Sequence, residues 1–273
     1  MTESEGSCEN SFTQPSDSEN ANSRSFTPKQ LRTAYGFEAS GFTGQGRAAV
    51  ILVFGQAVVL SDIDSYATGF GLAFRSNSDL YWYRWKDIPE YRSTNKNLEI
   101  TLDVETIVGL AKGVDRITVV AGPSQTTGQI LTYFPLMASR ALEKFISGGV
   151  VPDVISMSLG VCEDAWISSG ADVMIEALEI VFQTAAAAGV TVIFSSGDTG
   201  SSDCASREAP TPWAPNAEAV HYPASSPWVT AVGGTNLRLN ADNSIAEAQV
   251  WNDWPLVVDK ALSPNSGNPC DVP

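Results

Sequence analysis

The chain has 273 residues, of which 43% are hydrophobic, and its 16 Lys and Arg against 31 Asp and Glu give a net charge of −15 at pH 7. This length allows one substantial core or two small ones, and the acidity makes nucleic acid and anionic membrane surfaces poor partners. No stretch reaches the roughly 18 to 20 apolar residues needed to cross a bilayer. We therefore expect a globular protein that has neither a nucleic acid nor a membrane as its partner.

Residues 1–26 are predicted to form a flexible acidic leader. This segment is rich in Ser, Asn and Glu, lacks apolar periodicity, and carries five acidic residues against the single base Arg24. It does not have the basic start and apolar middle of a signal peptide. Two readings stay open, a cytosolic protein or an exported one whose export segment preceded residue 1.

Order is predicted to begin with a helix at Pro28. Thr27 is a suitable N-cap, Pro28 suits the first helical position, and Gly36 is a stop. A glycine turn then leads into a strand over 48–54, whose near-continuous apolar run is typical of a strand buried on both faces. Periodicity predicts further helices over 61–68, 97–110, 128–145 and 171–188, and strands over 116–121, 153–157, 190–194 and 228–232.

The alternation of strands and helices predicts an α/β fold. Such an order is typical of a doubly wound, mostly parallel sheet with helices on both faces and functional residues at the carboxyl ends of the strands. We expect one domain over 27–260, followed by an irregular tail over 261–273. The aromatic run Tyr81–Trp85 is predicted to be a loop packed under the sheet, and a substrate cleft is the alternative.

Two carboxylates four residues apart, Glu99 and Asp103, lie in the predicted helix over 97–110. Asn97 is a plausible N-cap, and the spacing places both side chains on one face of the helix. Two like charges this close disfavour each other's ionisation and suit general base work at acidic pH. The alternative is that both side chains belong to a solvated helix face.

Small residues follow two predicted strands at their carboxyl ends. Ser195–Gly200 contains Asp198 between glycines, which suits either an exposed functional carboxylate or a simple turn. Ser156–Gly160 is similarly small and lets another segment approach its backbone. The single histidine, His221, lies in a Pro-rich loop without an evident Asp or Ser partner, so a Ser-His-Asp triad is improbable.

The four cysteines have neither CxxC spacing nor a histidine nearby, which argues against zinc. Cys162 and Cys204 both fall in loops that follow predicted core strands. A disulfide between them is plausible in an oxidising compartment, and two free thiols are the alternative.

Five ordered motifs resemble those of the sedolisins, the serine-carboxyl peptidases, over about residues 27–251. In chain order they are Thr27-Pro28-x-x-Leu31-x-x-Ala34-Tyr35-Gly36, Glu99-x-x-x-Asp103, Ile155-Ser156-Met157-Ser158-x-Gly160, Ser195-Ser196-Gly197-Asp198-x-Gly200 and Tyr222-Pro223-Ala224-Ser225-Ser226-Pro227-x-Val229-Thr230-Ala231-Val232-Gly233-Gly234-Thr235. The resemblance implies a subtilisin-like fold and a secreted serine endopeptidase that acts on peptides and proteins at acidic pH.

The resemblance also implies roles for three residues. Glu99 corresponds to the general base, Asp103 to the carboxylate that orients and tunes it, and Asp198 to the residue that stabilises the oxyanion. A carboxyl group can stabilise an oxyanion only by donating a hydrogen bond, so it has to be protonated, which favours an acidic medium.

The sequence departs from the family pattern towards its C-terminus. The family's nucleophile is a serine in a Gly-Thr-Ser segment, whereas here Gly234-Thr235 is followed by Asn236, and no match follows Trp251-Asn252. We therefore expect a domain whose C-terminal part is missing, together with the nucleophile and the family's calcium site, so that this chain has no metal or other cofactor.

Three functional hypotheses follow. The first is the base-bearing part of a sedolisin, inactive alone, whose partners are its peptide substrate and a missing C-terminal segment. The second is a non-catalytic remnant that binds peptides or a partner. The third and weakest is a subtilisin-like enzyme that uses His221.

Overall fold

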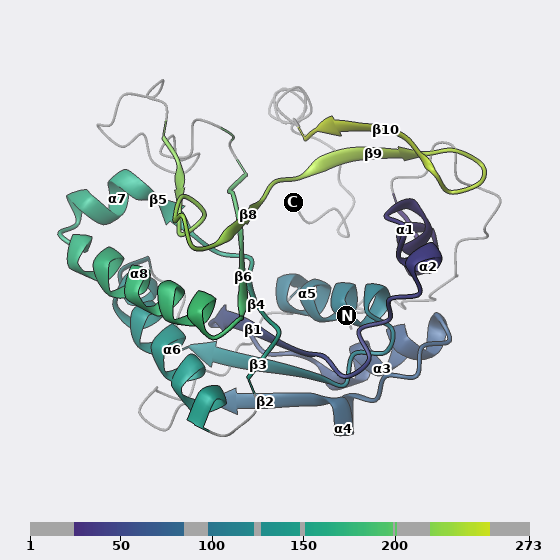
Figure 1. The fold of residues 1–273 in the computed structure, drawn as a ribbon, viewed down its shortest axis with the longest axis horizontal. Helices are drawn as coiled ribbons and strands as arrows, with labels where there is room; N and C mark the ends of the chain where they lie inside the picture. Colours follow the sequence, from purple (N-terminus) through teal and green to yellow (C-terminus); the bar gives the residue numbers. More distant parts are fainter. Residues whose placement is uncertain are drawn as a thin grey trace, which may run out of the picture.

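A six-stranded sheet with the order β2-β3-β1-β4-β6-β8 forms the centre of the molecule (Figure 1). The computed structural model describes residues 25–84, 98–122, 127–147, 151–198, 200 and 219–251. Every pair of neighbouring strands in this sheet is parallel. The strands are β1 (Ala48–Phe54), β2 (Leu80–Arg84), β3 (Arg116–Gly122), β4 (Val154–Met157), β6 (Thr191–Ser195) and β8 (Thr230–Val232).

Helices cover both faces of the sheet, as the sequence predicts. Side chains of β1 alternate between two cores, so that Val50 and Leu52 join one core while Ile51 and Val53 join the other. The first core packs under α6 (Thr127–Ser147) and α8 (Asp172–Ala187), and the second under α3 (Leu60–Gly69) and α5 (Leu98–Leu110). The strand order reverses around β1, and crevices at the carboxyl ends of strands form at such positions in open α/β sheets.

The first helix, α1 (Pro28–Ala34), begins with the predicted cap. The Thr27 hydroxyl accepts a hydrogen bond from the Gln30 backbone at 3.2 Å, and the Gln30 side chain accepts one from the Thr27 backbone at 2.9 Å. This reciprocal pair is a capping box. Gly36 follows with a φ of 77° and starts the single turn α2 (Phe37–Ser40), which the sequence did not predict.

Helix α5 settles an ambiguity in the sequence, because the residues from Leu98 to Val104 also alternate like a strand. In the structure Ile100, Val104 and Val108, at helical spacing, are buried against the sheet. Leu98 and Leu102 point away from the core and are 81% and 58% exposed. The predicted N-cap Asn97 lies outside the described residues.

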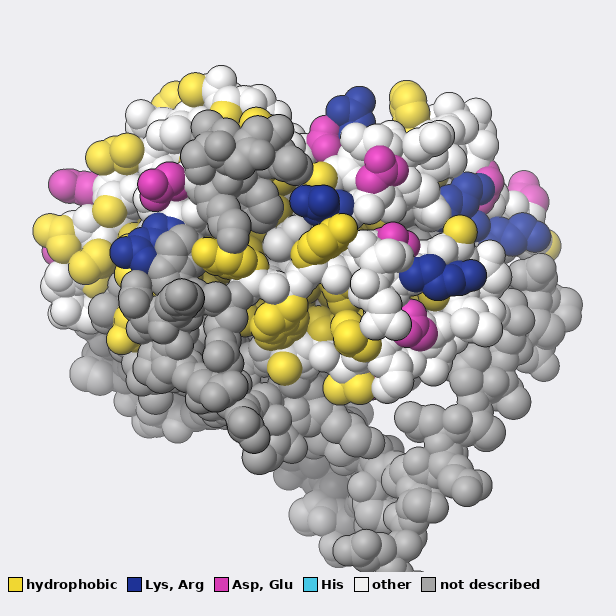
Figure 2. Space-filling model, turned by 90° about the horizontal axis from the view of Figure 1, so that it is seen from below, with side chains coloured by type: hydrophobic (Ala, Val, Ile, Leu, Met, Phe, Trp, Pro, Cys, Tyr) yellow, Lys and Arg dark blue, Asp and Glu magenta, His cyan; other side chains and the backbone are white. Residues whose placement is uncertain are grey.

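The prediction for residues 81–84 was wrong. They form the edge strand β2 and pair with β3 rather than forming a loop. Tyr81 and Trp82 are each about two-fifths exposed, at 43% and 42%. The Arg116 guanidinium lies 4.2 Å from the centre of the Tyr81 ring, a cation–π contact. The face seen from the β2 side carries hydrophobic side chains next to Lys and Arg (Figure 2).

Several short elements are absent from the sequence-based prediction. The hairpin β9 (Thr235–Leu239) and β10 (Ile245–Val250) is largely exposed and therefore lacks an alternating apolar pattern. The others have six residues or fewer and are α4 (Ser76–Asp79), α7 (Glu163–Ser168), β5 (Val161–Cys162) and β7 (His221–Tyr222).

Part of the sheet face next to α5 is not covered by any described helix. A cavity of about 460 Å³ lies there, and its walls include Ile107 and Leu110 of α5, Val154 of β4 and Ile193 of β6. Parallel sheets are normally covered on both faces. Among the described helices, none is long and apolar enough to span a membrane.

Candidate active site

The carboxylates predicted to act together lie at the carboxyl edge of the sheet. Helix α5 carries Glu99 in its first turn and Asp103 one turn later. Each is hydrogen-bonded to a residue within two positions of the end of a strand. Gln56, two residues beyond the end of β1, donates from Nε2 to Glu99 Oε2 at 3.3 Å. Ser158, the residue after β4, donates from Oγ to Asp103 Oδ1 at 2.9 Å.

The environment of Glu99 favours its neutral form. Its pKa is raised, first because the carboxyl group loses part of its hydration and then because the negative charges of Asp103 and Asp198 act on it. The hydrogen bond from Gln56 opposes these effects, since it stabilises the carboxylate. Asp103 and Asp198 are therefore both close enough to Glu99 to influence its protonation.

Asp103 is half-buried, and burial raises its pKa as well. The hydrogen bond from Ser158 acts in the opposite direction. Among the described residues, no hydrogen bond joins the carboxyl groups of Glu99 and Asp103 to each other. The two groups thus interact through charge, each held by its own polar partner.

Asp198 belongs to a different segment of the chain, the turn after β6. It is exposed and follows β6 in the turn that contains Gly197, whose φ of 88° suits glycine. Its charge raises the pKa of Glu99, 99 residues away in sequence. The fold thus brings together all three residues that sequence reasoning singled out.

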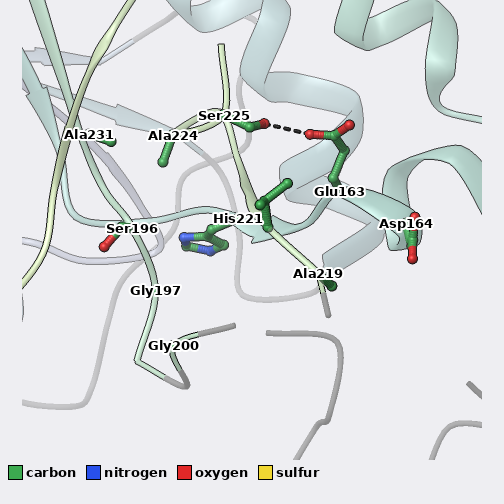
Figure 3. Close-up of a pocket in the computed structure, with 11 residues that line it drawn as sticks. Glu163, Asp164, Ser196, Gly197, Gly200, Ala219, His221, Ala224, Ser225 and Ala231 are labelled. Carbon is green, nitrogen blue, oxygen red and sulfur yellow. Dashed lines mark hydrogen bonds between the residues drawn. The ribbon is translucent and has the colours of Figure 1, made fainter. Parts of the chain in front are cut away.

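A cavity of about 640 Å³ is lined by Gly197 and Gly200, which flank Asp198 in sequence (Figure 3). One wall comes from the strand ends at Ser196, Gly197 and Ala231, and another from the first residues of α7. Ser225 donates a hydrogen bond to Glu163 Oε2 at 2.5 Å on that second wall. Small side chains predominate, which leaves room for a ligand group of side-chain size.

The ring of His221 lines this cavity between Ser196 and Ala219 (Figure 3). Its Nδ1 lies 3.1 Å from the carbonyl oxygen of Ser195, and because a carbonyl only accepts, Nδ1 is the donor. The ring packs on Gly160, where an added Cβ would lie 2.6 Å from His221 Cε1. These contacts make His221 part of the cavity wall and orient its ring through Nδ1.

The geometry can be compared with that of known proteins. The profile of the subtilase family matches residues 95–266 of this chain. Kumamolisin from Bacillus sp. (strain MN-32) is 29% identical over 238 residues, which are 87% of this chain and 39% of that protein. Sedolisin from Pseudomonas sp. (strain 101) is 28% identical over 228 residues, which are 83% of this chain and 36% of that protein.

A solved structure shows the same arrangement of elements. The Pseudomonas sedolisin, a serine-carboxyl proteinase complexed with two molecules of pseudo-iodotyrostatin, matches with a TM-score of 0.70 at 28% identity. The match covers 85% of this chain and 60% of the sedolisin chain. The chain belongs to the subtilase family, in its sedolisin branch. Its fold is subtilisin-like, as the motifs predicted.

This sedolisin-type chain spans less than two fifths of the length of kumamolisin and of sedolisin. The proteins it resembles are serine peptidases, so the family is a family of enzymes. Among the described residues, no group of three or more His, Cys, Asp and Glu is placed to hold a metal ion.

One cysteine of the predicted pair can be assessed. Cys162 is disulfide-bonded, whereas Cys204, its predicted partner, lies outside the described residues. Residues 1–24 of the predicted leader lie outside the described residues. So does the chain beyond Trp251, which includes the predicted tail. The predicted domain limits therefore stay predictions.

Sequence reasoning missed the polar partners of the sedolisin-type carboxylates. Gln56 has no motif of its own, although it follows the end of β1, where functional residues of α/β sheets gather. Ser158 belongs to one of the family motifs. Its hydrogen bond to Asp103 joins residues 55 positions apart, so it can be recognised only in the folded structure. The cavity around His221 was not predicted either.

Proposed function

We propose that this chain is the base-bearing part of a sedolisin-type serine endopeptidase that cleaves peptide bonds in acid. The observation that supports this most directly is the convergence of Glu99, Asp103 and Asp198, in which both aspartates raise the pKa of Glu99. This proposal is supported by the charge of Asp198, in the turn after β6, acting on Glu99 of α5.

In the proposed mechanism Glu99 accepts the proton of a serine hydroxyl while the serine oxygen attacks the carbonyl carbon of the scissile bond. The charge of Asp103 raises the pKa of Glu99, so that Glu99 can pass the proton to the leaving amine. Asp198, in its protonated form, donates a hydrogen bond to the oxyanion of the tetrahedral intermediate. Water then releases the acyl group by the same steps.

Two features support an acidic working range. Glu99 and Asp103 both have raised pKa values, chiefly through loss of hydration, so the pair changes protonation at higher pH than free carboxyl groups do. Asp198 has to carry a proton to act as a donor. The mechanism needs Glu99 ionised as the base and Asp198 protonated as the donor. An acidic medium satisfies both requirements.

We infer that a peptide lies along the carboxyl edge of the sheet and places one side chain in the 640 Å³ cavity. The cavity adjoins the Asp198 turn and has walls of small residues. Its position next to the proposed oxyanion donor would bring the carbonyl of the bound residue towards Glu99. Substrates of this kind are peptides or unfolded proteins.

We also infer that the serine comes from a further segment of a sedolisin domain. The chain lacks the Gly-Thr-Ser pattern, and the apolar sheet face beside α5 is not covered by a described helix. A helix packed on Val154 and Ile193 next to α5 would fill this cavity and complete the two-sided cover that parallel sheets need. A family calcium site would belong to that segment as well.

Export is part of the proposal. Cys162 is disulfide-bonded, and disulfides persist in oxidising compartments such as the extracellular space. This observation favours the exported reading over the cytosolic one.

The test compares the chain alone with the chain joined to a sedolisin C-terminal segment that carries its serine. With unfolded protein as substrate at about pH 3 to 5, where carboxyl groups titrate, we expect no turnover from the chain alone. Loss of a nucleophile costs on the order of 10⁶-fold in rate. The completed protein should cleave, Glu99→Gln should abolish cleavage, and Glu176→Gln on the exposed face of α8 should not.

Two results would overturn this proposal. Cleavage by the chain alone, blocked by a serine-directed aldehyde, would reveal a nucleophile within these residues. A completed protein that binds peptides without cleaving them would instead favour the non-catalytic binding module.

A further inference from the structure

Gln56 occupies a position from which it can act on α5. It follows Gly55, whose φ of 65° turns the chain out of β1 and whose N–H donates to the Gly122 carbonyl at 3.1 Å. This bond continues the β1–β3 ladder by one residue and fixes the start of the loop. Gln56 itself is half-buried and directly follows this bonded glycine.

The Gln56 side chain forms two hydrogen bonds with consecutive residues of α5. Its Oε1 accepts from the backbone N–H of Ile100 at 3.1 Å, and its Nε2 donates to Glu99 Oε2 at 3.3 Å. The two contacts fix the orientation of the amide, because a backbone N–H can only donate and a carboxylate can only accept. A residue 44 positions away thus satisfies an N–H of the first turn of α5, which has no partner within the helix.

We propose that Gln56 is a positioning residue for Glu99, which ties the carboxyl group of the general base to the end of β1 through the first turn of α5. This role rests on the proposed function, in which Glu99 takes the serine proton. With Oε2 held by the amide, Oε1 is the oxygen left to exchange the proton. The contact with Gln56 therefore favours one orientation of the Glu99 carboxyl group before substrate binds.

The charges around Glu99 are consistent with this role. Asp103 on the same helix and Asp198 after β6 both disfavour its ionisation, and loss of hydration does so more strongly. Gln56 is the one neighbour among the described residues whose contact favours the carboxylate. Without it, Glu99 would hold its proton to higher pH and would be a base over a narrower acidic range.

The experiment follows the Glu99 carboxyl carbon by NMR through a pH titration of the 273-residue chain. The resonance is assigned by its absence in Glu99→Gln. In Gln56→Met, which keeps the length of the side chain but removes both hydrogen bonds, the Glu99 midpoint should move to higher pH. Gln45→Met, at an exposed turn, should leave the midpoint unchanged.

A second variant tests whether the side chain at position 56 faces the Glu99 carboxyl group. In Gln56→Glu, one oxygen can still accept from Ile100 N–H, but the other presents a carboxylate to Glu99 instead of a donor. Because a negative charge raises the pKa of a carboxyl group beside it, the Glu99 midpoint should move to higher pH, and an unchanged midpoint would overturn the contact. Gln56→Glu also decides the matter if Gln56→Met does not fold, as judged by its amide spectrum.

The outcomes for Gln56 and for the proposed function are distinct. An unchanged Glu99 midpoint in the folded variants would overturn the role of Gln56 and would not affect the peptidase assay of the completed protein. A completed wild-type protein that does not cleave would overturn the proposed function, whatever the titration shows.

Discussion

Three acidic residues of α5 share a property that their sequence positions do not reveal. Glu99, Asp103 and Glu105 all have raised pKa values, and loss of hydration is the largest cause for each. The first two belong to the candidate site. Glu105 does not, and burial together with the charge of Asp62 raises its pKa from 4.5 to about 6. Glu105 therefore opposes folding at neutral pH.

We predict that Glu105→Gln stabilises the protein at pH 7. The folded state holds the Glu105 proton up to about pH 6, and the unfolded state releases it near 4.5, so the destabilisation is absent below 4.5 and complete above 6. A shift of this size corresponds to at most about 2 kcal/mol, and to about 1 kcal/mol after solvent screening. Urea unfolding at pH 4 and pH 7 measures the difference.

The gain should be confined to the higher pH. Glu176→Gln, at an exposed position of α8, is the matched control and should change stability little at either pH. If Glu105→Gln has the same effect at pH 4 as at pH 7, the side chain does not titrate as described.

At the scale of elements, α8 is tied to the loop that forms the wall of the cavity. Glu179 of α8 accepts hydrogen bonds from the Tyr222 hydroxyl at 3.1 Å and from Ser226 Oγ at 3.0 Å. Both donors are buried, and the pKa of Tyr222 is raised by burial and by the charge of Glu179. This contact fixes the segment that carries His221 and Ser225 into the cavity.

Glu179→Ala should destabilise the protein by about 1 to 3 kcal/mol, because it leaves buried hydroxyl groups without their acceptor. Tyr222 would retain only its longer bond to the Ile175 carbonyl, at 3.3 Å, among the bonds recorded for the described residues. Urea unfolding measures the loss, with Glu176→Ala as the comparison from the same helix. Equal stabilities of the two variants would mean that the Glu179 contacts contribute nothing.

At the scale of the whole molecule, two groups of carboxyl residues respond to pH in opposite directions. Glu38, Asp64 and Asp153 have lowered pKa values. The main cause is the hydrogen bond from Arg32 for Glu38, the hydrogen bonds from Ser76 for Asp64, and the hydrogen bond from the Ala48 backbone, followed by that from Arg47, for Asp153. Their stabilisation is present above the unfolded pKa values near 4 and is lost in stronger acid. The acidic residues of α5, whose pKa values are raised, instead lower the stability of the folded state as pH rises.

We therefore predict that wild-type stability is greatest at about pH 4.5 to 5.5, where the first group is still ionised and Glu105 has not yet lost its proton. The net charge of −15 at pH 7 adds repulsion that falls with acidity. Urea unfolding between pH 3 and pH 8 provides the profile. A maximum at pH 7 or above would contradict this balance.

The sequence by itself determined the periodic elements and the order of the motifs. The apolar run of β1 and the cap of α1 depend on neighbouring residues, so local patterns predicted them correctly. Glu99 and Asp103 could be paired for the same reason, since helical spacing alone places them on one face. Asp198 was found through its motif at the end of a strand.

Only the tertiary structure decided which distant residues meet. The bonds of Gln56 to α5 and of Ser158 to Asp103 join positions 43 to 55 residues apart, and no local pattern encodes such contacts. Strand β2 was missed because its pairing with β3, rather than an apolar alternation, makes it a strand. The cavity at His221 likewise exists because three separate segments converge there, which depends on how the sheet is wound.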